Sequence, residues 1–260
     1  MGKSATGQPM RSAERLLQVL SAFTLAHPAR SIAELAAELR LAVSTVRRLV
    51  ETLGRHGYLR QDAASGRYSP HFQVVRLAGV AISSFDLIKA AGPVLDRLAE
   101  ATGETIELAM RSEASAVVVS HRPSKHAFRL VRPLGTVYRC YRGAAAGKVL
   151  LAWLPEAHVR EILPAKGTWA GNTPLSITST RTLMAALKQV RQRGYATNDG
   201  ETDSDVWVVA APVRDHTDAV IAALAIPCLA LRVSAAGKRQ LAKQVCAAAA
   251  ELSRIAHMNV

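Results

Sequence analysis

The chain has 260 residues, of which 49% are hydrophobic, so it can bury a substantial core and wholesale disorder is excluded. Its formal net charge of +13 indicates attraction to a polyanionic partner, and residues 1–80 alone hold eleven Lys/Arg against five Asp/Glu. No apolar run approaches the roughly 18 residues that span a bilayer, and the polar N-terminal segment has no signal-peptide core. We therefore expect a cytoplasmic protein without a membrane partner.

The first 40 residues predict two short helices. Around residues 12–24 the apolar positions Leu16, Leu17, Leu20 and Phe23 follow the spacing of a half-buried helix, which His27-Pro28 would end. The next segment begins with Ser31 and carries Glu34 three residues later. This spacing is typical of a capping box, in which each residue satisfies a free amide at the helix start.

A third helix follows after only four residues, 40–43. Ser44 is its candidate N-cap, and the segment STVRRLVETLGRHG places its apolar residues on one face. The opposite face carries Ser44, Arg48, Glu51 and Arg55. Two helices joined by so short a turn predict a helix-turn-helix, whose second helix enters the major groove of DNA.

Two β-prone stretches, residues 58–61 and 67–69, are joined by five residues that include Ser65 and Gly66, which predicts a hairpin. Helix, capped helix, short turn, basic helix and hairpin together make a winged helix-turn-helix. We expect base contacts from Thr45, Arg47 and Arg48, because arginine grips guanine with two hydrogen bonds. Ser31 and Ser44 lie at helix N-termini that favour phosphate, and Arg55 and Arg67 are expected to contact the DNA backbone.

Residues 70–90 are largely helical in pattern. Such a helix either joins two domains and pairs with its symmetry mate or packs within the second domain. Gly92-Pro93 then predicts a break before a helix over 94–102.

Beyond it, strands are predicted at 104–111, 116–121, 128–132, 206–213 and 219–226, and helices at 144–153, 156–163, 180–193 and 234–257. Strands in consecutive groups favour an α+β fold. Trp207, inside an apolar strand, is expected in the core, at an interface or in the wall of a pocket.

Several kinds of chemistry lack their sequence signals. There is no GxGxxG, no phosphate loop and no GxSxG, and Lys148 is not followed by Ser or Thr. Three distant cysteines exclude a disulfide framework and give no zinc spacing. The acidic loop of Asp199, Glu201, Asp203 and Asp205 is either a metal site or, as is usual for alternating acids, a solvated surface. We expect no metal and no cofactor.

At this point the chain resembles the IclR family of transcriptional regulators over residues 12–255. The resemblance rests on STVRRLVETL, on GAAAGKVLLA (143–152), on RGYATNDGET (193–202) and on VVAAPV followed by VIAALAI. It implies an N-terminal winged helix-turn-helix (1–70), a linker helix (71–90) and a GAF-like effector-binding domain (91–260). It also implies a homodimer or a dimer of dimers that binds a double-stranded DNA operator as repressor or activator.

The resemblance places an effector cavity between the sheet and the loop before the helix near Gly143. The free amides of that helix start suit an anion. By correspondence with the family, the cavity wall includes Ala145, Ala146, Asn198, Val206, Val208, Ala225 and Pro227.

This chain departs from family habit at Cys140-Tyr141-Arg142, where many members have Pro-Leu-His. It also has Asn198, Ala225 and Pro227 where polar Asp and Ser are common. A small carboxylate with an apolar or aromatic body therefore fits better than a hydrophilic keto acid, with Arg142 or the helix start holding its charge. Alternatively, Arg142 is a surface residue and Tyr141 a packing residue.

Two competing functions stay open. One is an enzyme fused to a DNA-binding module, a hydrolase using Cys140 with His121 or His126. An exposed Cys140 beside Tyr141-Arg142 would have a lowered thiol pKa. The other is a nucleoid-like protein with little sequence preference, which would bind specific and random DNA about equally. We expect a regulator rather than an enzyme.

Overall fold

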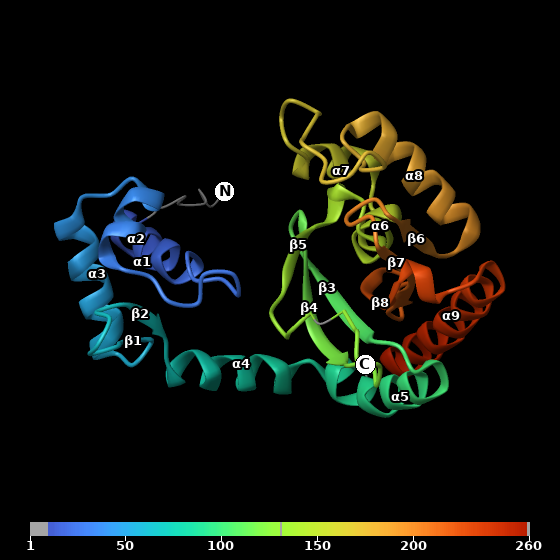
Figure 1. Cartoon of the computed structure of the whole chain (residues 1–260), viewed down its shortest axis with the longest axis horizontal. Helices are drawn as coiled ribbons and strands as arrows, with labels where there is room; N and C mark the ends of the chain where they lie inside the picture. Colours follow the sequence, from blue (N-terminus) through green and yellow to red (C-terminus); the bar gives the residue numbers. More distant parts are fainter. Residues whose placement is uncertain (1–9, 131, 259–260) are drawn as a thin grey trace, which may run out of the picture. The chain divides into compact units, whose positions relative to one another are not determined.

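A computed structural model describes residues 10–130 and 132–258 of the chain (Figure 1). Its contacts divide into two compact units, Met1–Ser84 and Phe85–Val260. The described part of the first unit contains α1 (Arg11–Ser21), α2 (Ile32–Leu39), α3 (Val43–Arg55), β1 (Leu59–Gln61), β2 (Tyr68–Pro70) and α4 (Phe72–Ser84). Strands β1 and β2 form an antiparallel hairpin, so the expected winged helix-turn-helix is confirmed.

The core of the first unit is formed by α1, α2, α3 and the hairpin around Val19, Leu35, Val46, Val50 and Leu59. One expected core position is wrong. The side chain of Leu17 is 61% exposed, and Val19 takes the inward position on α1. This helix also ends at Ser21, ahead of the expected stop at His27-Pro28.

The predicted capping box at the start of α2 is confirmed, because Ser31 and Glu34 each accept a hydrogen bond from the other's backbone amide. The expected cap at Ser44 is wrong. Arg40 adopts a left-handed conformation (φ 54°) that ends α2, and the extended residue Ala42 then takes the N-cap position of α3. Ser44 therefore lies inside the first turn of α3.

The second unit begins with α5 (Asp86–Thr102), which runs through Gly92 and Pro93 without interruption. The expected break there is wrong, since α4 ends and α5 begins on either side of Phe85. Proline removes one hydrogen bond from a helix. The apolar face of α5, buried between the sheet and the C-terminal helix, outweighs that loss.

In the described part of the chain, six strands of the second unit form one antiparallel sheet in the order β5-β4-β3-β8-β7-β6. The strands are β3 (Ile106–Ser112), β4 (Ser115–Arg122), β5 (Val137–Arg139), β6 (Ala196–Asp199), β7 (Val206–Arg214) and β8 (Val220–Leu229). The expected α+β class is confirmed. The described residues of the expected strand 128–132 form no strand, because β5 occupies the edge beside β4; residue 131 lies outside the described residues.

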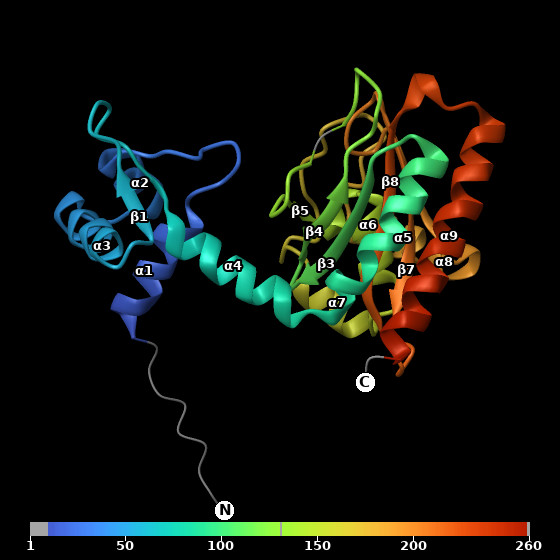
Figure 2. The ribbon, with the colours of Figure 1, turned by 90° about the horizontal axis from the view of Figure 1, so that it is seen from below.

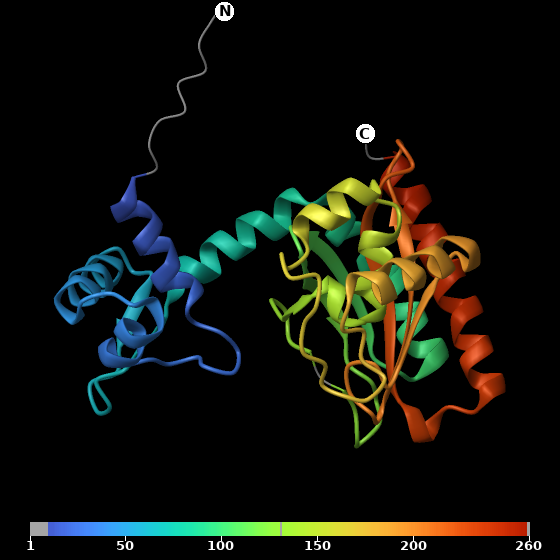
Figure 3. The same ribbon diagram turned by 90° about the horizontal axis from the view of Figure 1, so that it is seen from above.

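Helices cover both faces of this sheet (Figure 2 and Figure 3). One face carries α5 and α9 (Ala235–Met258). The other carries α6 (Ala145–Ala152), α7 (Glu156–Ile162) and α8 (Thr180–Arg193). Strand β7 shows the alternation, since Trp207 and Val209 face α9 whereas Val206 and Val208 face α6. Trp207 therefore lies in the core, one of its three expected places.

Two 3₁₀ turns complete the described elements of this unit. The turn η1 (Cys140–Arg142) lies between β5 and α6, and η2 (Ala230–Arg232) follows β8. Within the described ranges, no helix has the length and the apolar character that crossing a membrane requires.

Candidate functional site

Helix α3 presents a basic face to solvent. Arg47, Arg48 and Arg55 are exposed, whereas Thr45 is half-buried on the same flank. The start of α3 has no side-chain cap and no acidic residue in its first turn. Its free amides and the neighbouring arginines thus make a positively charged helix start, which is the arrangement that phosphate binding uses.

The start of α2 differs, because a carboxylate of the chain already occupies it. Glu34 lies against the amide of Ser31, and its two oxygens accept hydrogen bonds of 2.9 and 2.7 Å from Nη2 of Arg67 in the wing. The same Nη2 also donates to the carbonyl of Ala29. Ser31 and Arg67 therefore lie beside a negative charge, and their expected phosphate contacts stay predictions.

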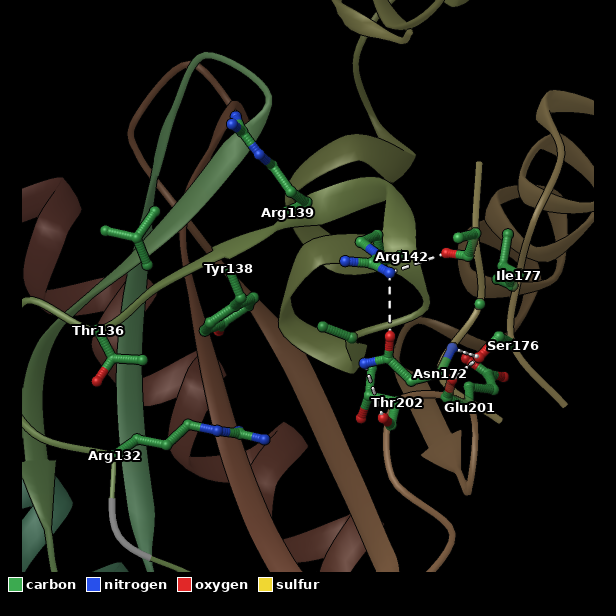
Figure 4. Close-up of a pocket in the computed structure, with 14 residues that line it drawn as sticks. Arg132, Thr136, Tyr138, Arg139, Arg142, Asn172, Ser176, Ile177, Glu201 and Thr202 are labelled. Carbon is green, nitrogen blue, oxygen red and sulfur yellow. Dashed lines mark hydrogen bonds between the residues drawn. The ribbon is translucent and has the colours of Figure 1, made fainter. Parts of the chain in front are cut away.

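A cavity of about 320 Å³ opens in the second unit beside α6 (Figure 4). Its walls come from the segment leading into β5, from η1, and from the loops at 170–177 and 201–202. The lining residues are Arg132, Thr136, Val137, Tyr138, Arg139, Arg142, Ala144, Ala170, Gly171, Asn172, Ser176, Ile177, Glu201 and Thr202.

Two arginines reach this cavity from opposite sides (Figure 4). Arg142 donates from Nη2 to the carbonyl of Ala170 at 2.8 Å and to Oδ1 of Asn172 at 3.0 Å. Arg132 extends past Tyr138, with its guanidinium carbon 5.7 Å from the ring centre. The cavity therefore has positive charge on two sides and an aromatic ring between them.

A smaller space of about 10 Å³ lies deeper, against the sheet. Arg132, Tyr138 and Ala144 line both spaces; the other lining residues are Glu107, Ala145, Ala146, Asn198, Val208 and Ala225. Of the residues expected from the sequence, Arg142 lines the outer cavity and five line the inner space. The inner space lies between the sheet and the start of α6, and the effector-binding role of the expected residues stays a prediction.

Three expected wall residues line neither space. Tyr141 packs edge-on against Trp169 with ring centres 4.9 Å apart. Val206 is buried in the core, and Pro227 on β8 is paired with Val208 on the neighbouring strand β7. Sequence reasoning also missed Arg132, Tyr138 and Glu107. Arg132 and Tyr138 lie in a segment for which the sequence predicted a strand at 128–132, whereas the strand found there is β5 at 137–139. Glu107 gave a usable signal, since a charged residue inside an apolar strand needs an explanation.

Comparison with known proteins decides the family. Residues 12–63 match the IclR helix-turn-helix domain, and residues 79–254 match the family described as bacterial transcriptional regulator IclR C-terminal. The chain belongs to the IclR family. It is a DNA-binding transcriptional regulator with an N-terminal helix-turn-helix and a C-terminal IclR effector domain.

Individual relatives agree with this membership. The chain is 32% identical over 245 residues to the HTH-type transcriptional regulator XynR of Escherichia coli, covering 94% of this chain and 96% of XynR. It is 34% identical over 203 residues to KdgR of the same species, covering 78% and 76%. A putative IclR regulator from Silicibacter sp. TM1040 superposes with a TM-score of 0.84 at 27% identity, covering 95% and 96%.

In this IclR-family chain, the loop beside the cavity is fixed by a buried ion pair. Nζ of Lys148 on α6, whose side chain is 4% exposed, contacts Oε2 of Glu201. Burial lowers the pKa of the Lys148 ammonium and raises the pKa of Glu201, and their mutual attraction opposes both shifts. Gly143 has φ +92°, and a side chain there would meet Glu201. Two acids of this loop are thus paired with lysines, Glu201 with Lys148 and Asp199 with Lys238.

Cys140 does not have the reactive environment that a hydrolase would need. Its side chain is fully buried against α6, where Gly147 allows a close approach. Burial raises the pKa of the Cys140 thiol to about 12. A lowered thiol pKa was expected only for an exposed Cys140, and the buried side chain does not meet that condition. His126, one of the two histidines considered as a partner for Cys140, has its Nε2 atom 3.6 Å from Oε1 of Glu104.

Proposed function

We propose that this regulator is ligand-responsive and that its cavity binds a small carboxylate with an apolar or aromatic body. The observation that carries the proposal is the set of arginines around the cavity: Arg132, Arg139 and Arg142 line it, against the single acid Glu201. Glu201 is paired with Lys148 and Arg132 with Glu107, whereas Arg139 and Arg142 have no acidic partner within the described ranges, so the balance of charge favours an anion.

The rest of the wall supports an apolar body. Val137, Tyr138, Ala144 and Ile177 contribute carbon surface, and the volume of about 320 Å³ suits a molecule of a few to about a dozen heavy atoms. Both guanidinium groups are partly engaged, Arg132 through Nη1 on Glu107 and Arg142 through Nη2 on Ala170 and Asn172. We take Arg132 to hold the carboxylate, because it lines both the outer cavity and the inner space.

For the DNA-binding unit we propose base contacts from Thr45, Arg47 and Arg48 near the start of α3, where the exposed arginines stand beside free helix amides. Ser44 in the first turn and Arg55 in the last turn of α3 would contact phosphates. Arg67 would do so through Nη1, because Nη2 is held by Glu34.

We further infer that a second copy of this chain covers α4. This helix exposes apolar side chains around much of its circumference, among them Phe72, Val75, Leu77 and Ile82. A helix apolar on most sides is stable in water only when it is covered. A second copy suits the position because a dimer brings a second recognition helix to the operator, and helix-turn-helix proteins bind paired half-sites.

Thermal unfolding of the full chain with benzoate or hexanoate tests the ligand class. We expect both acids to raise the Tm of the wild type, since a ligand that binds only the native state stabilises it. Arg132→Ala should lose most of this rise. Arg160→Ala is the matched control, because Arg160 is an exposed arginine of α7 paired with Glu156. An unchanged Tm of the wild type at millimolar concentrations of both acids would contradict the proposal.

A further inference from the structure

Glu107 is a carboxylate in the middle of the central sheet. Its side chain is 1% exposed, and in the strand register it lies between His121 on β4 and Ala225 on β8. Burial in this setting raises the pKa of Glu107. Glu107 is the second residue of β3, next to buried apolar residues, and a buried carboxylate there needs a hydrogen-bonding partner.

Only one of its two oxygens has such a partner. Oε2 accepts a hydrogen bond of 3.2 Å from Nη1 of Arg132. Oε1 is buried and accepts no hydrogen bond from any residue in the described ranges. A buried acceptor loses its hydration on folding, and that loss is recovered only when a donor reaches it.

Glu107 lines the inner space of about 10 Å³, which holds about one water-sized group. Apart from Arg132 and Tyr138, the wall of this space is mostly small and apolar. Its remaining polar side chain, Asn198, is already engaged: Nδ2 donates to Thr202, and Oδ1 accepts from the amide of Glu201. Of the carboxylate and amide side chains in this wall, Glu107 is therefore the one with an oxygen that accepts no hydrogen bond from the described residues.

Arg132 and Tyr138 line both the inner space and the outer cavity, so a group in the inner space can belong to a molecule in the outer one. Arg132 holds Oε2 of the same carboxylate whose Oε1 is free. A donor that reaches Oε1 must therefore lie close to any anion held by the remaining nitrogens of this guanidinium. A small molecule that carries a carboxylate and a hydrogen-bond donor on the adjacent carbon can bind Arg132 and donate to Oε1 at the same time.

We propose that Glu107 is a specificity-determining residue of the effector site. Its Oε1 accepts a hydrogen bond from a hydroxyl or ammonium group on the carbon next to the effector's carboxylate, and Arg132 binds that carboxylate. The effector is thus a 2-hydroxy or 2-amino acid with an apolar or aromatic body. This inference rests on the proposed anion-binding function of the cavity and narrows it.

Matched pairs of acids test it by calorimetry on the full chain: mandelate against phenylacetate, and phenylalanine against 3-phenylpropionate. We expect the donor-bearing member of at least one pair to bind about tenfold more tightly, because its partner leaves Oε1 unsatisfied. Glu107→Met keeps the length of the side chain and removes the acceptor, so the preference should fall below about twofold while the acid still binds.

Glu107→Gln keeps a neutral acceptor, and it decides the point if Glu107→Met does not fold. It should reduce a preference for the ammonium more than a preference for the hydroxyl. Glu161→Gln, at an exposed glutamate of α7, should change none of the four affinities. Equal affinity within both pairs, or a preference that persists in Glu107→Met, overturns the inference and leaves the anion site intact. If none of the four acids binds the wild type, both proposals fail.

Discussion

The wing and the second helix of the DNA-binding unit are joined by one ion pair, in which a single nitrogen of Arg67 contacts both carboxylate oxygens of Glu34. Glu34 at the same time caps the start of α2 through Ser31. One carboxylate therefore fixes the helix start and the position of the hairpin. An arginine expected to face DNA is partly used inside the protein.

This pair predicts a pH dependence of stability. The hydrogen bond from the Ser31 amide, followed by that from Arg67, lowers the pKa of Glu34 from 4.5 to about 2. A carboxyl group with a lowered folded-state pKa stabilises the protein above its unfolded-state pKa, and this contribution is lost as the pH falls from about 4.5 towards 2. Glu34→Gln should therefore lower the Tm at pH 7, and the difference from the wild type should shrink over that range.

Thermal unfolding followed by circular dichroism at several pH values measures this effect. Glu51→Gln serves as the control, because Glu51 is an exposed glutamate on α3. It should shift the Tm much less than Glu34→Gln. A Tm difference for Glu34→Gln that stays constant from pH 7 to pH 3 would show that the carboxylate charge does not matter.

Two arginines of the DNA-binding unit should respond differently to replacement. Arg48→Ala removes a proposed base contact and should cost about 1–3 kcal/mol on an operator selected from random-sequence DNA, with little loss on non-specific DNA. Arg67→Ala should weaken binding to both and reduce the slope of log K against log salt by about 1. Fluorescence anisotropy at several salt concentrations measures both quantities. Equal losses on both kinds of DNA for Arg48→Ala would rule out its base-reading role.

The exposed surface of α4 predicts that a charge there prevents self-association. Val75 is 68% exposed in the single chain, and Val75→Glu should convert a dimer into a monomer at micromolar concentration, since burying an unpaired carboxylate is costly. Light scattering coupled to gel filtration gives the mass directly. Arg76→Glu, on the next residue, should leave more dimer than Val75→Glu does. A wild type that is monomeric at this concentration is the result that contradicts the inference.

The buried pair of Lys148 and Glu201 predicts strong coupling. Glu201→Ala leaves a buried ammonium without its partner and should lower the free energy of unfolding by about 3–5 kcal/mol. Lys148→Met combined with Glu201→Leu removes both charges and should recover most of that loss. Urea unfolding of the single and double variants measures the coupling energy. Strictly additive effects would mean that the two residues do not act as a pair.

Local patterns were enough to predict most helices and the long strands. The capping box at Ser31 and Glu34 and helix α8 at 180–193 agree with the structure residue by residue. The buried spacing of Val46, Val50 and Leu53 on α3 is also confirmed. These features depend on side chains within one or two helical turns of each other, and such relations are visible in the order of residues.

The errors arose where a distant segment decided the outcome. Pro93 is a helix breaker by local rules, yet α5 continues through it because its apolar face is buried against the sheet and α9. The error at Ser44 is the exception, because its cause is local: the left-handed turn at Arg40, four residues earlier, moved the helix start to Val43. The edge strand beside β4 is 137–139 rather than 128–132, because strand pairing selects its partner in space.

By itself, the sequence determined the two-part organisation, the α+β class and the basic face of α3, since each depends on composition or on short-range spacing, and its motifs resembled those of the family that the comparisons then showed. Only the tertiary structure brought Arg132 beside Glu107, placed Glu107 in the wall of the inner space and left its Oε1 without a hydrogen bond from the described residues. The two residues are 25 positions apart and meet because the chain folds back along the sheet. Contacts of that kind depend on the packing of the whole domain, which no local pattern records.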